Sequence, residues 1–245
     1  MNYSVSLWLV LALPSAVWRE VIDIMYRIIL IMVLALFLFR AIWIYRAGKW
    51  DFNLFISLIQ QRVELLLKWL TLAELKSNII KGFRYFFISI TIITFLILVV
   101  TALIPVLLFG ESLSGIFLIL HVTIAPFFVI ALMFNAVFMG HFQQFDHSDY
   151  LTLKNLQSKT EIQYPNRSTH HTWLKIYFWF FLIFSVTAIL SVISAMFPYF
   201  GTDGQIAMLN IHRYSTLILL IIALFYVDLK LNASHFKLKR EQIDK

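Results

Sequence analysis

The sequence predicts an all-α membrane protein: a bundle of about five transmembrane helices with one interfacial amphipathic helix. Apolar residues make up 61% of its 245 residues and charged residues only 13%, whereas a soluble domain carries about 25% charged residues. Several nearly uncharged runs approach the roughly 20 helical residues that cross a ~30 Å hydrocarbon core. Basic residues gather in alternate loops, as membrane topology requires. We therefore expect residues 1–245 to form a single integral membrane domain.

Five segments have the length and composition of spans. The first contains Arg27 and Arg40 near its ends, which we interpret as anchors whose long side chains reach the membrane interfaces. The last becomes long enough only when it extends back to Asn210 and the side chain of Arg213 snorkels. The expected spans are residues 25–45, 85–109, 115–140, 176–200 and 210–229.

Two further apolar segments are expected to lie at the membrane without crossing it. Val5 to Trp18 is short and contains Pro14, which favours an interfacial or re-entrant piece, and no basic residue precedes it as in a secretory signal. Residues 54–72 mix Leu and Ile with Gln60 and Glu64. That mixture is typical of an amphipathic helix on the inner membrane face.

Lysine and arginine counts predict the orientation. Residues 46–84 contain seven, 141–175 contain four and 230–245 contain five, whereas the facing loops 110–114 and 201–211 contain none. The positive-inside rule therefore places the N-terminus outside and the C-terminus in the cytoplasm. The same rule accounts for the net charge of +7, so the charge gives no reason to expect nucleic acid as a partner, and lipid is expected instead.

Two histidines are the candidate metal ligands. The chain has no Cys, which excludes thiolate-bound iron–sulfur clusters and covalently attached haem. His121 lies about 9 Å below the outer end of its span, at ~1.5 Å per residue from Gly115. Alternating topology brings His212 to the same outer half. Two imidazoles facing each other across a bundle are what a bis-histidine haem requires, and Arg213 could meet a haem propionate. The alternative is a hydrated or backbone-bonded histidine.

Short motifs around these residues resemble a known family. They are GFRYFF, SGIFLILHVTIAPFF, FGTDGQ and NIHRYSTLILLIIALFYVDL, and they are spread over residues 82–231. They resemble the membrane cytochrome b subunits of respiratory formate dehydrogenases, hydrogenases and related quinone-linked complexes. The resemblance implies a bundle of four or five helices in a bacterial or archaeal cytoplasmic membrane, with haem b ligated by His121 and His212.

The sequence departs from the two-haem pattern of the broader cytochrome b group. Members with two haems often carry a second histidine about fourteen positions along each ligand helix, where this chain has Asn135 and Tyr226. We therefore expect one haem, and keep His141 with His171 or His235 as the ligands of a second. Asp203 is expected to form a turn with its neighbouring glycines.

The expected function is electron transfer without a complete catalytic activity of the chain's own. A haem near the outer face implies an extracytoplasmic c-type cytochrome or metalloenzyme subunit as partner, with a quinone as the other reactant. The main alternative is a haem-free scaffold or anchor subunit of a larger membrane complex. A transporter ranks third, because the spans show neither a charged pathway nor paired broken helices.

Overall fold

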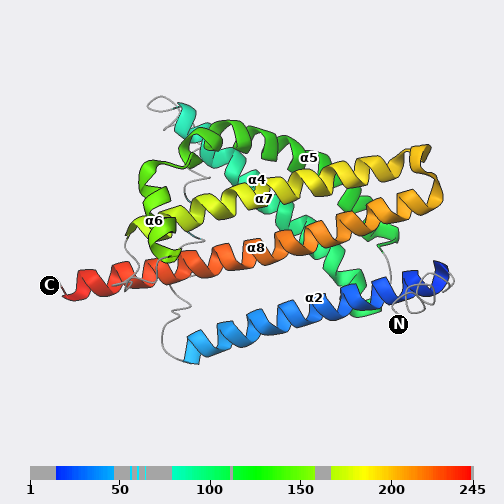
Figure 1. Ribbon diagram of the computed structural model, residues 1–245, viewed down its shortest axis with the longest axis horizontal. Helices are drawn as coiled ribbons and strands as arrows, with labels where there is room; N and C mark the ends of the chain where they lie inside the picture. The colour runs from blue at the N-terminus through cyan, green and yellow to red at the C-terminus, as the bar shows by residue number, and fades with distance from the viewer. Residues whose placement is uncertain are drawn as a thin grey trace, which may run out of the picture.

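A computed structural model of the chain describes residues 15–46, 56, 60, 64, 79–110, 113–157 and 167–243, and the secondary structure among them is entirely helical (Figure 1). The all-α class is therefore confirmed. The helices are α2 (Ser15–Arg46), α4 (Ile79–Ile104), η1 (Pro105–Phe109), α5 (Gly115–Gly140), η2 (His141–Gln143), α6 (His147–Gln157), α7 (Arg167–Met196), η3 (Pro198–Phe200) and α8 (Gly201–Ile243).

Five helical stretches of the described chain are long and apolar enough to cross a membrane, as the sequence predicts for an integral membrane protein. They are Glu20–Arg46, Gly82–Phe109, Gly115–Gln143, His171–Met196 and Gly201–Leu229. Of the predicted interfacial helix at residues 54–72, Ile56, Gln60 and Glu64 are helical and exposed, and the remainder lies outside the described residues. So does most of the segment Val5 to Trp18.

The last helix begins earlier than expected, at Gly201 rather than Asn210. Gly201 has a φ of 65° and follows the short helix η3, so it closes the turn by itself. Asp203 was expected in that turn, but it lies in the first turn of α8. A carboxylate there is favoured by the helix dipole, which explains why the polar sequence GTDGQ is helical.

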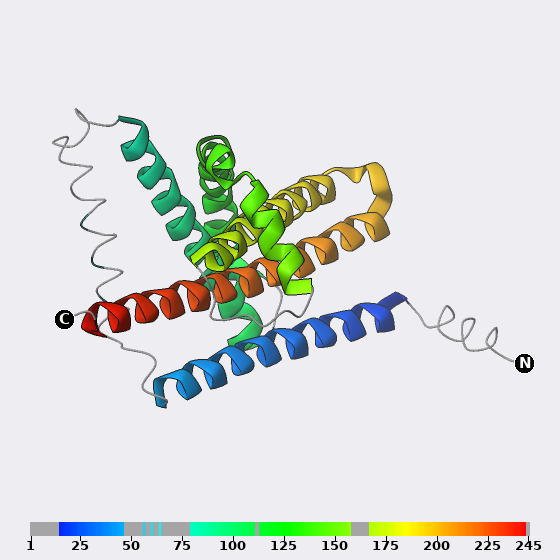
Figure 2. The ribbon, with the colours of Figure 1, turned by 60° about the vertical axis from the view of Figure 1, so that its left-hand side comes forward.

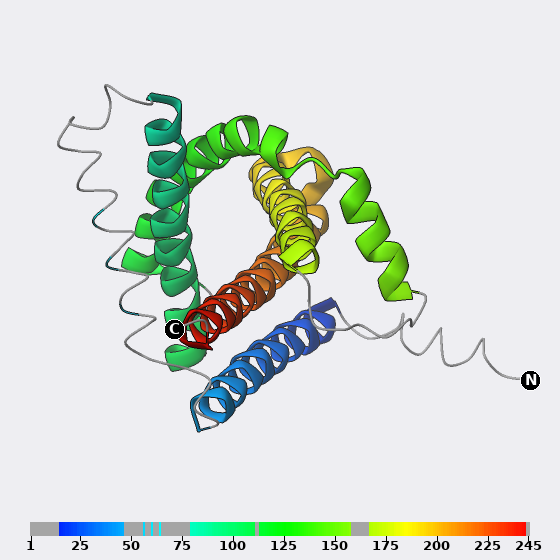
Figure 3. The same cartoon turned by 90° about the vertical axis from the view of Figure 1, so that its left-hand side faces the viewer.

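Two antiparallel hairpins, α4–α5 and α7–α8, make up most of the bundle. Figure 3 shows α4, α5, α7 and α8 arranged around a ring, with α2 outside it beside α8 and α6 to one side. In Figure 1 the turn between α7 and α8 lies at one end of the bundle, here called the turn end, and α6 lies toward the other, the α6 end. Figure 2 shows α2 running alongside α8. The ring brings α5 of one hairpin opposite α8 of the other.

Small side chains allow α7 and α8 to pack closely. Ser185, Ala188 and Ser191 of α7 are buried, as is Ser215 of α8. Since lipid is as apolar as leucine, helices in a membrane associate by close van der Waals packing, which small residues permit. These residues therefore set the tight α7–α8 pairing on which the position of His212 depends.

Aromatic stacking and one amide join α4 to α5. The Phe87 and Phe134 rings stack with centroids 4.2 Å apart. The buried Asn135 side chain donates from Nδ2 to the Phe87 carbonyl at 3.1 Å and to Thr91 Oγ1 at 2.6 Å. Asn135 thus bridges the two helices at the level where a second haem ligand would lie.

Helix α2 runs parallel to α8 and is joined to it by two ion pairs. Arg213 binds Asp23 toward the turn end. Arg40 donates to both carboxylate oxygens of Asp228 toward the α6 end, at 2.7 and 3.2 Å. Between the pairs, Leu30 packs with Leu217 and Leu220 of α8. The two expected anchors therefore behave differently, because Arg40 is held by an acidic partner and Arg27 lies against Gly110 in the α4–α5 loop.

A closed polar network fixes α6 to α7. Asp146 and Asp149 accept hydrogen bonds from each other's backbone N–H groups, both at 2.9 Å, which is the reciprocal arrangement of a capping box at the start of α6. Asp149 also accepts from Thr172 Oγ1 at 2.6 Å and from Lys175 Nζ at 2.5 Å. All three of these last side chains are buried.

Candidate metal centre

His121 is held by the neighbouring helix of its own hairpin. Its Nδ1 lies 3.0 Å from Thr101 Oγ1 of α4. That hydroxyl lies 2.8 Å from the Ile97 carbonyl and 3.0 Å from the Leu98 carbonyl, both of which can only accept its proton. When the hydroxyl donates its proton to one of these carbonyls, the Thr101 oxygen accepts from His121, and Nδ1 then carries the imidazole proton. A neutral imidazole protonated at Nδ1 has its lone pair at Nε2.

His212 is held in the same way by the other hairpin. Its Nδ1 lies 2.8 Å from the backbone oxygen of Ala188 in α7. A carbonyl oxygen cannot donate, so Nδ1 must carry the proton and Nε2 again holds the lone pair. A ligand histidine ordinarily donates its second N–H to a carbonyl or a similar acceptor, which fixes the tautomer and the ring orientation. In both His121 and His212, Nδ1 lies at hydrogen-bond distance from such an oxygen.

The structure brings the two histidines near each other. His121 and His212 are near enough to interact electrostatically, and both are partly buried. Their Nδ1 partners, Thr101 and Ala188, belong to α4 and α7, so four helices of the ring converge here. This convergence is what the alternating topology of the sequence predicts for two histidines in the same half of the bundle.

The chemistry of the donor set tests which metal could bind. Among the described residues there is no group of three or more His, Cys, Asp or Glu that could hold a metal ion. Two imidazoles alone leave a protein-bound zinc or copper ion short of ligands. They suit an iron whose other four ligands come from a porphyrin. The residues therefore fit a bis-histidine haem better than a bare ion.

Ser185 is a buried polar group close in sequence to this site. Its hydroxyl is fully buried on α7, one turn before Ala188, and has no hydrogen-bond partner within the described part of the chain. Unpaired buried hydroxyls are costly and mark either an unseen partner or strain. Ser185 is thus a buried polar group within the closely packed α7–α8 pair.

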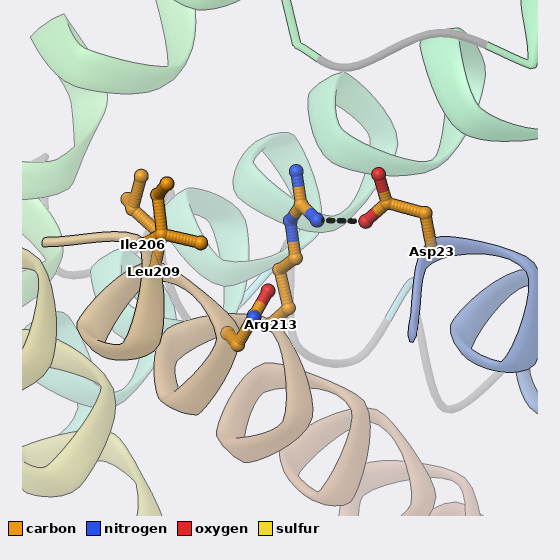
Figure 4. Close-up of a pocket in the computed structure, with 5 residues that line it drawn as sticks. Asp23, Ile206, Leu209 and Arg213 are labelled. Carbon is orange, nitrogen blue, oxygen red and sulfur yellow. Dashed lines mark hydrogen bonds and ion pairs between the residues drawn. The ribbon is translucent and has the colours of Figure 1, made fainter. Parts of the chain in front are cut away.

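Arg213 has a partner other than the expected one. Its guanidinium binds Asp23 of α2 (Figure 4), and the expected contact with a haem propionate stays a prediction. His212 next to it faces α7, whereas Arg213 faces α2. The side chains of these two neighbouring residues therefore lie on different faces of α8.

The described candidates for ligands of a second haem are not held by an acceptor in the way that His121 and His212 are. His141 and His171 are both exposed, and the ring of His141 contacts Phe142 with centroids 5.8 Å apart. The side chain of His235 lies outside the described residues. Asn135 is committed to its bridge with α4, and the Tyr226 side chain is exposed.

Sequence reasoning missed the acidic partners of the arginines. Asp23 and Arg40 lie on α2 in the order negative then positive, and Arg213 and Asp228 lie on α8 in the order positive then negative. Two spans that run in the same direction with complementary charges at similar spacing predict a pair of helices held at both ends. That pattern was readable in the sequence.

Comparison of the chain with protein-family models, curated proteins and solved structures finds no match.

Proposed function

We propose that the chain is a membrane cytochrome b subunit that binds one haem b between His121 and His212. One observation carries the proposal: each imidazole is bound through Nδ1 by an acceptor, which directs the lone pair to Nε2. The resemblance of the motifs around these residues to cytochrome b subunits of quinone-linked complexes supports the same function. The haem would supply one-electron redox chemistry.

The protein's own contribution is to hold and tune that group. Thr101 and the Ala188 carbonyl orient the two imidazoles and increase their basicity as ligands. The apolar ring of helices excludes water, which together with the ligands sets the redox potential. Electrons would pass between a quinone pool and a redox partner of another chain.

The expected topology favours a partner on the outer face. By the positive-inside rule, the turn end, whose segment 201–211 contains no Lys or Arg, would face outward and the α6 end would face the cytoplasm of a bacterial or archaeal cell. The histidine pair then lies in the outer half of the bilayer. A partner at that face, such as a c-type cytochrome or a metalloenzyme subunit, is within reach of the site.

The test is a reduced-minus-oxidised visible spectrum with pyridine-haemochrome quantification on purified full-length protein. We expect about one b-type haem per chain, and its loss in both His121→Ala and His212→Ala. His141→Ala is the matched control and should keep its haem, because that exposed ring has no acceptor preparing it as a ligand. Retention of haem in both ligand variants would overturn the assignment. Protein that contains no haem, although purified with its partners attached, would favour a scaffold subunit instead.

A further inference from the structure

The ion pair between Asp23 and Arg213 lies far from the ends of the span that carries it. Twelve residues of the stretch Gly201–Leu229 precede Arg213 and sixteen follow it, which is about 18 Å and about 24 Å of helix. The guanidinium contacts the Asp23 carboxylate of α2 (Figure 4). Charged groups at such a depth are costly in a membrane, and they are therefore candidates for a functional role.

Packing between α2 and α8 holds the pair in a fixed place. The Tyr26 ring of α2 meets the Tyr214 ring of α8 edge to face, with centroids 5.9 Å apart. One turn farther along α2, Leu30 packs on buried leucines of α8. Both contacts follow Asp23 along the same helix, so the carboxylate keeps its position relative to Arg213.

The two charges lie at different distances from the histidine site. His212 directly precedes Arg213 in α8 and is bonded toward α7, whereas α2 lies outside the ring, beside α8 (Figure 3). The thickness of α8 with its side chains, about 10 Å, therefore separates Arg213 from the site, and the ion pair places the Asp23 carboxylate roughly 15 Å away. The cation is the nearer of the two charges.

Lipid surrounds the outer side of the pair. Next to Asp23, the α2 side chains Ile24, Met25 and Ile28 are each more than half exposed on a helix of membrane-spanning character. Water and salt screen charges weakly in such surroundings, so the interaction between charges extends farther there than at a wet surface. Both residues of the pair can therefore act on the histidine site without touching it.

We propose that this ion pair sets the reduction potential of the histidine site, with Arg213 favouring the reduced state and Asp23 limiting that effect. The inference rests on the proposed function, because it concerns the haem held between His121 and His212. Each electron that the redox partner delivers adds one negative charge to the site. A nearby cation stabilises that charge, and a nearby carboxylate opposes it.

The two residues should have opposite effects, which a purely structural role would not produce. With an effective dielectric constant of ~20, a unit charge changes the ratio of reduced to oxidised haem roughly tenfold at ~10 Å and roughly fivefold at ~15 Å. At a fixed ambient potential, we expect Asp23→Asn to raise this ratio about fivefold and Arg213→Gln to lower it about tenfold. Arg213→Lys keeps the charge and should stay within about twofold of the wild type.

The second ion pair provides a matched control. Arg40 and Asp228 join the same two helices through the same chemistry. Asp228 lies sixteen residues after His212 in α8, which is about 24 Å of helix, and the Arg40 side chain is exposed. Distance and screening should therefore keep Asp228→Asn within about twofold of the wild type, although it loses a clamp between α2 and α8 just as Asp23→Asn does.

The experiment follows the visible spectrum of full-length protein in nanodiscs while redox mediators hold a series of ambient potentials. Haem content and unfolding temperature are measured for every variant. Shifts in the same direction for Asp23→Asn and Arg213→Gln would overturn the proposal. So would a shift in Asp228→Asn as large as that in Asp23→Asn, or shifts that follow the loss of stability and not the sign of the charge.

The haem content separates this proposal from the proposed function. A wild type with about one haem per chain, whose potential is unchanged in Asp23→Asn and Arg213→Gln, would overturn the role of the ion pair and leave the cytochrome proposal intact. A wild type without haem, although purified with its partners attached, would overturn both.

Discussion

The polar groups at the two ends of α7 are satisfied in different ways. At the α6 end, one carboxylate oxygen of the buried Asp149 accepts a hydrogen bond from the Thr172 hydroxyl. The other oxygen accepts hydrogen bonds from Lys175 Nζ and from the Asp146 N–H. Toward the turn end, His121 and His212 each use Nδ1 for a protein acceptor and keep the chemistry of Nε2 for another partner. A closed network holds helices together, whereas the histidine pair has its Nε2 atoms left for the haem that we propose.

The largest expected effect is the loss of the closed network in Asp149→Leu. The substitution leaves Lys175 buried, with only the more distant Asp146 at 3.6 Å. Removing one partner of a buried ion pair should lower the free energy of unfolding by about 3 kcal/mol. Denaturant or thermal unfolding in detergent measures it, and the haem bound per folded molecule should not change.

Asp146→Asn is the control for that experiment. The Asp146 side chain is 62% exposed and lies farther from Lys175, so its replacement should affect stability much less. Comparable destabilisation by the two variants would show that the burial of Asp149 does not set the strength of the network. A loss of haem in folded Asp149→Leu would break the distinction between the two ends.

A smaller effect is expected from Thr101→Val, which removes the acceptor for His121 Nδ1 but keeps the side-chain volume. Loss of such an outer-shell partner weakens metal-site affinity about 10- to 100-fold. We expect a change at the lower end, measured by haem transfer to an apoprotein competitor, with a shifted redox potential. Thr94→Val is the matched control, because Thr94 is also buried on α4 and its hydroxyl bonds carbonyls of its own helix. Equal haem affinity in both variants would contradict the role of Thr101 in positioning His121.

The fold was predictable because each span is a continuous apolar run in the sequence. An apolar run such as residues 115–140 must form a helix in lipid, since its backbone groups have no other partners there. The start of α8 was misplaced because polar residues after Gly201 look like a loop, and only the glycine's positive φ shows that the turn ends there. Alternating topology then sufficed to place His121 and His212 in the same half of the bundle.

The partners of the charged residues were missed, because their only signal is the complementary order of charges on two distant spans. Arg40 and Asp228 are 188 positions apart in sequence, so each taken alone looks like an isolated charge at a membrane interface. The pairing depends on α2 packing beside α8 and not beside α4 or α5, which hydrophobicity alone does not decide.

The smallest expected effect is a dependence of the α6 end on acid. Hydrogen bonds from the Ser148 hydroxyl and the Asp149 N–H lower the pKa of Asp146. Burial acts to raise the pKa of Asp149, but the bonds from Lys175, Thr172 and the Asp146 N–H outweigh it and lower the pKa overall. A carboxyl group whose pKa is lowered by folding stabilises the folded state fully at pH values above its unfolded pKa of about 3.9. That stabilisation is lost as the pH falls through the folded pKa.

Hydrogen exchange in α6 should therefore be unchanged between about pH 7 and 5, after correction for the intrinsic rate, and should accelerate below about pH 4. The acceleration should be smaller in Asp149→Asn, where protection is already reduced at neutral pH and only Asp146 still contributes its lowered pKa. A wild type whose α6 protection began to fall near pH 6, in step with histidine titration, would mean that an imidazole and not this carboxylate network holds that end of α7.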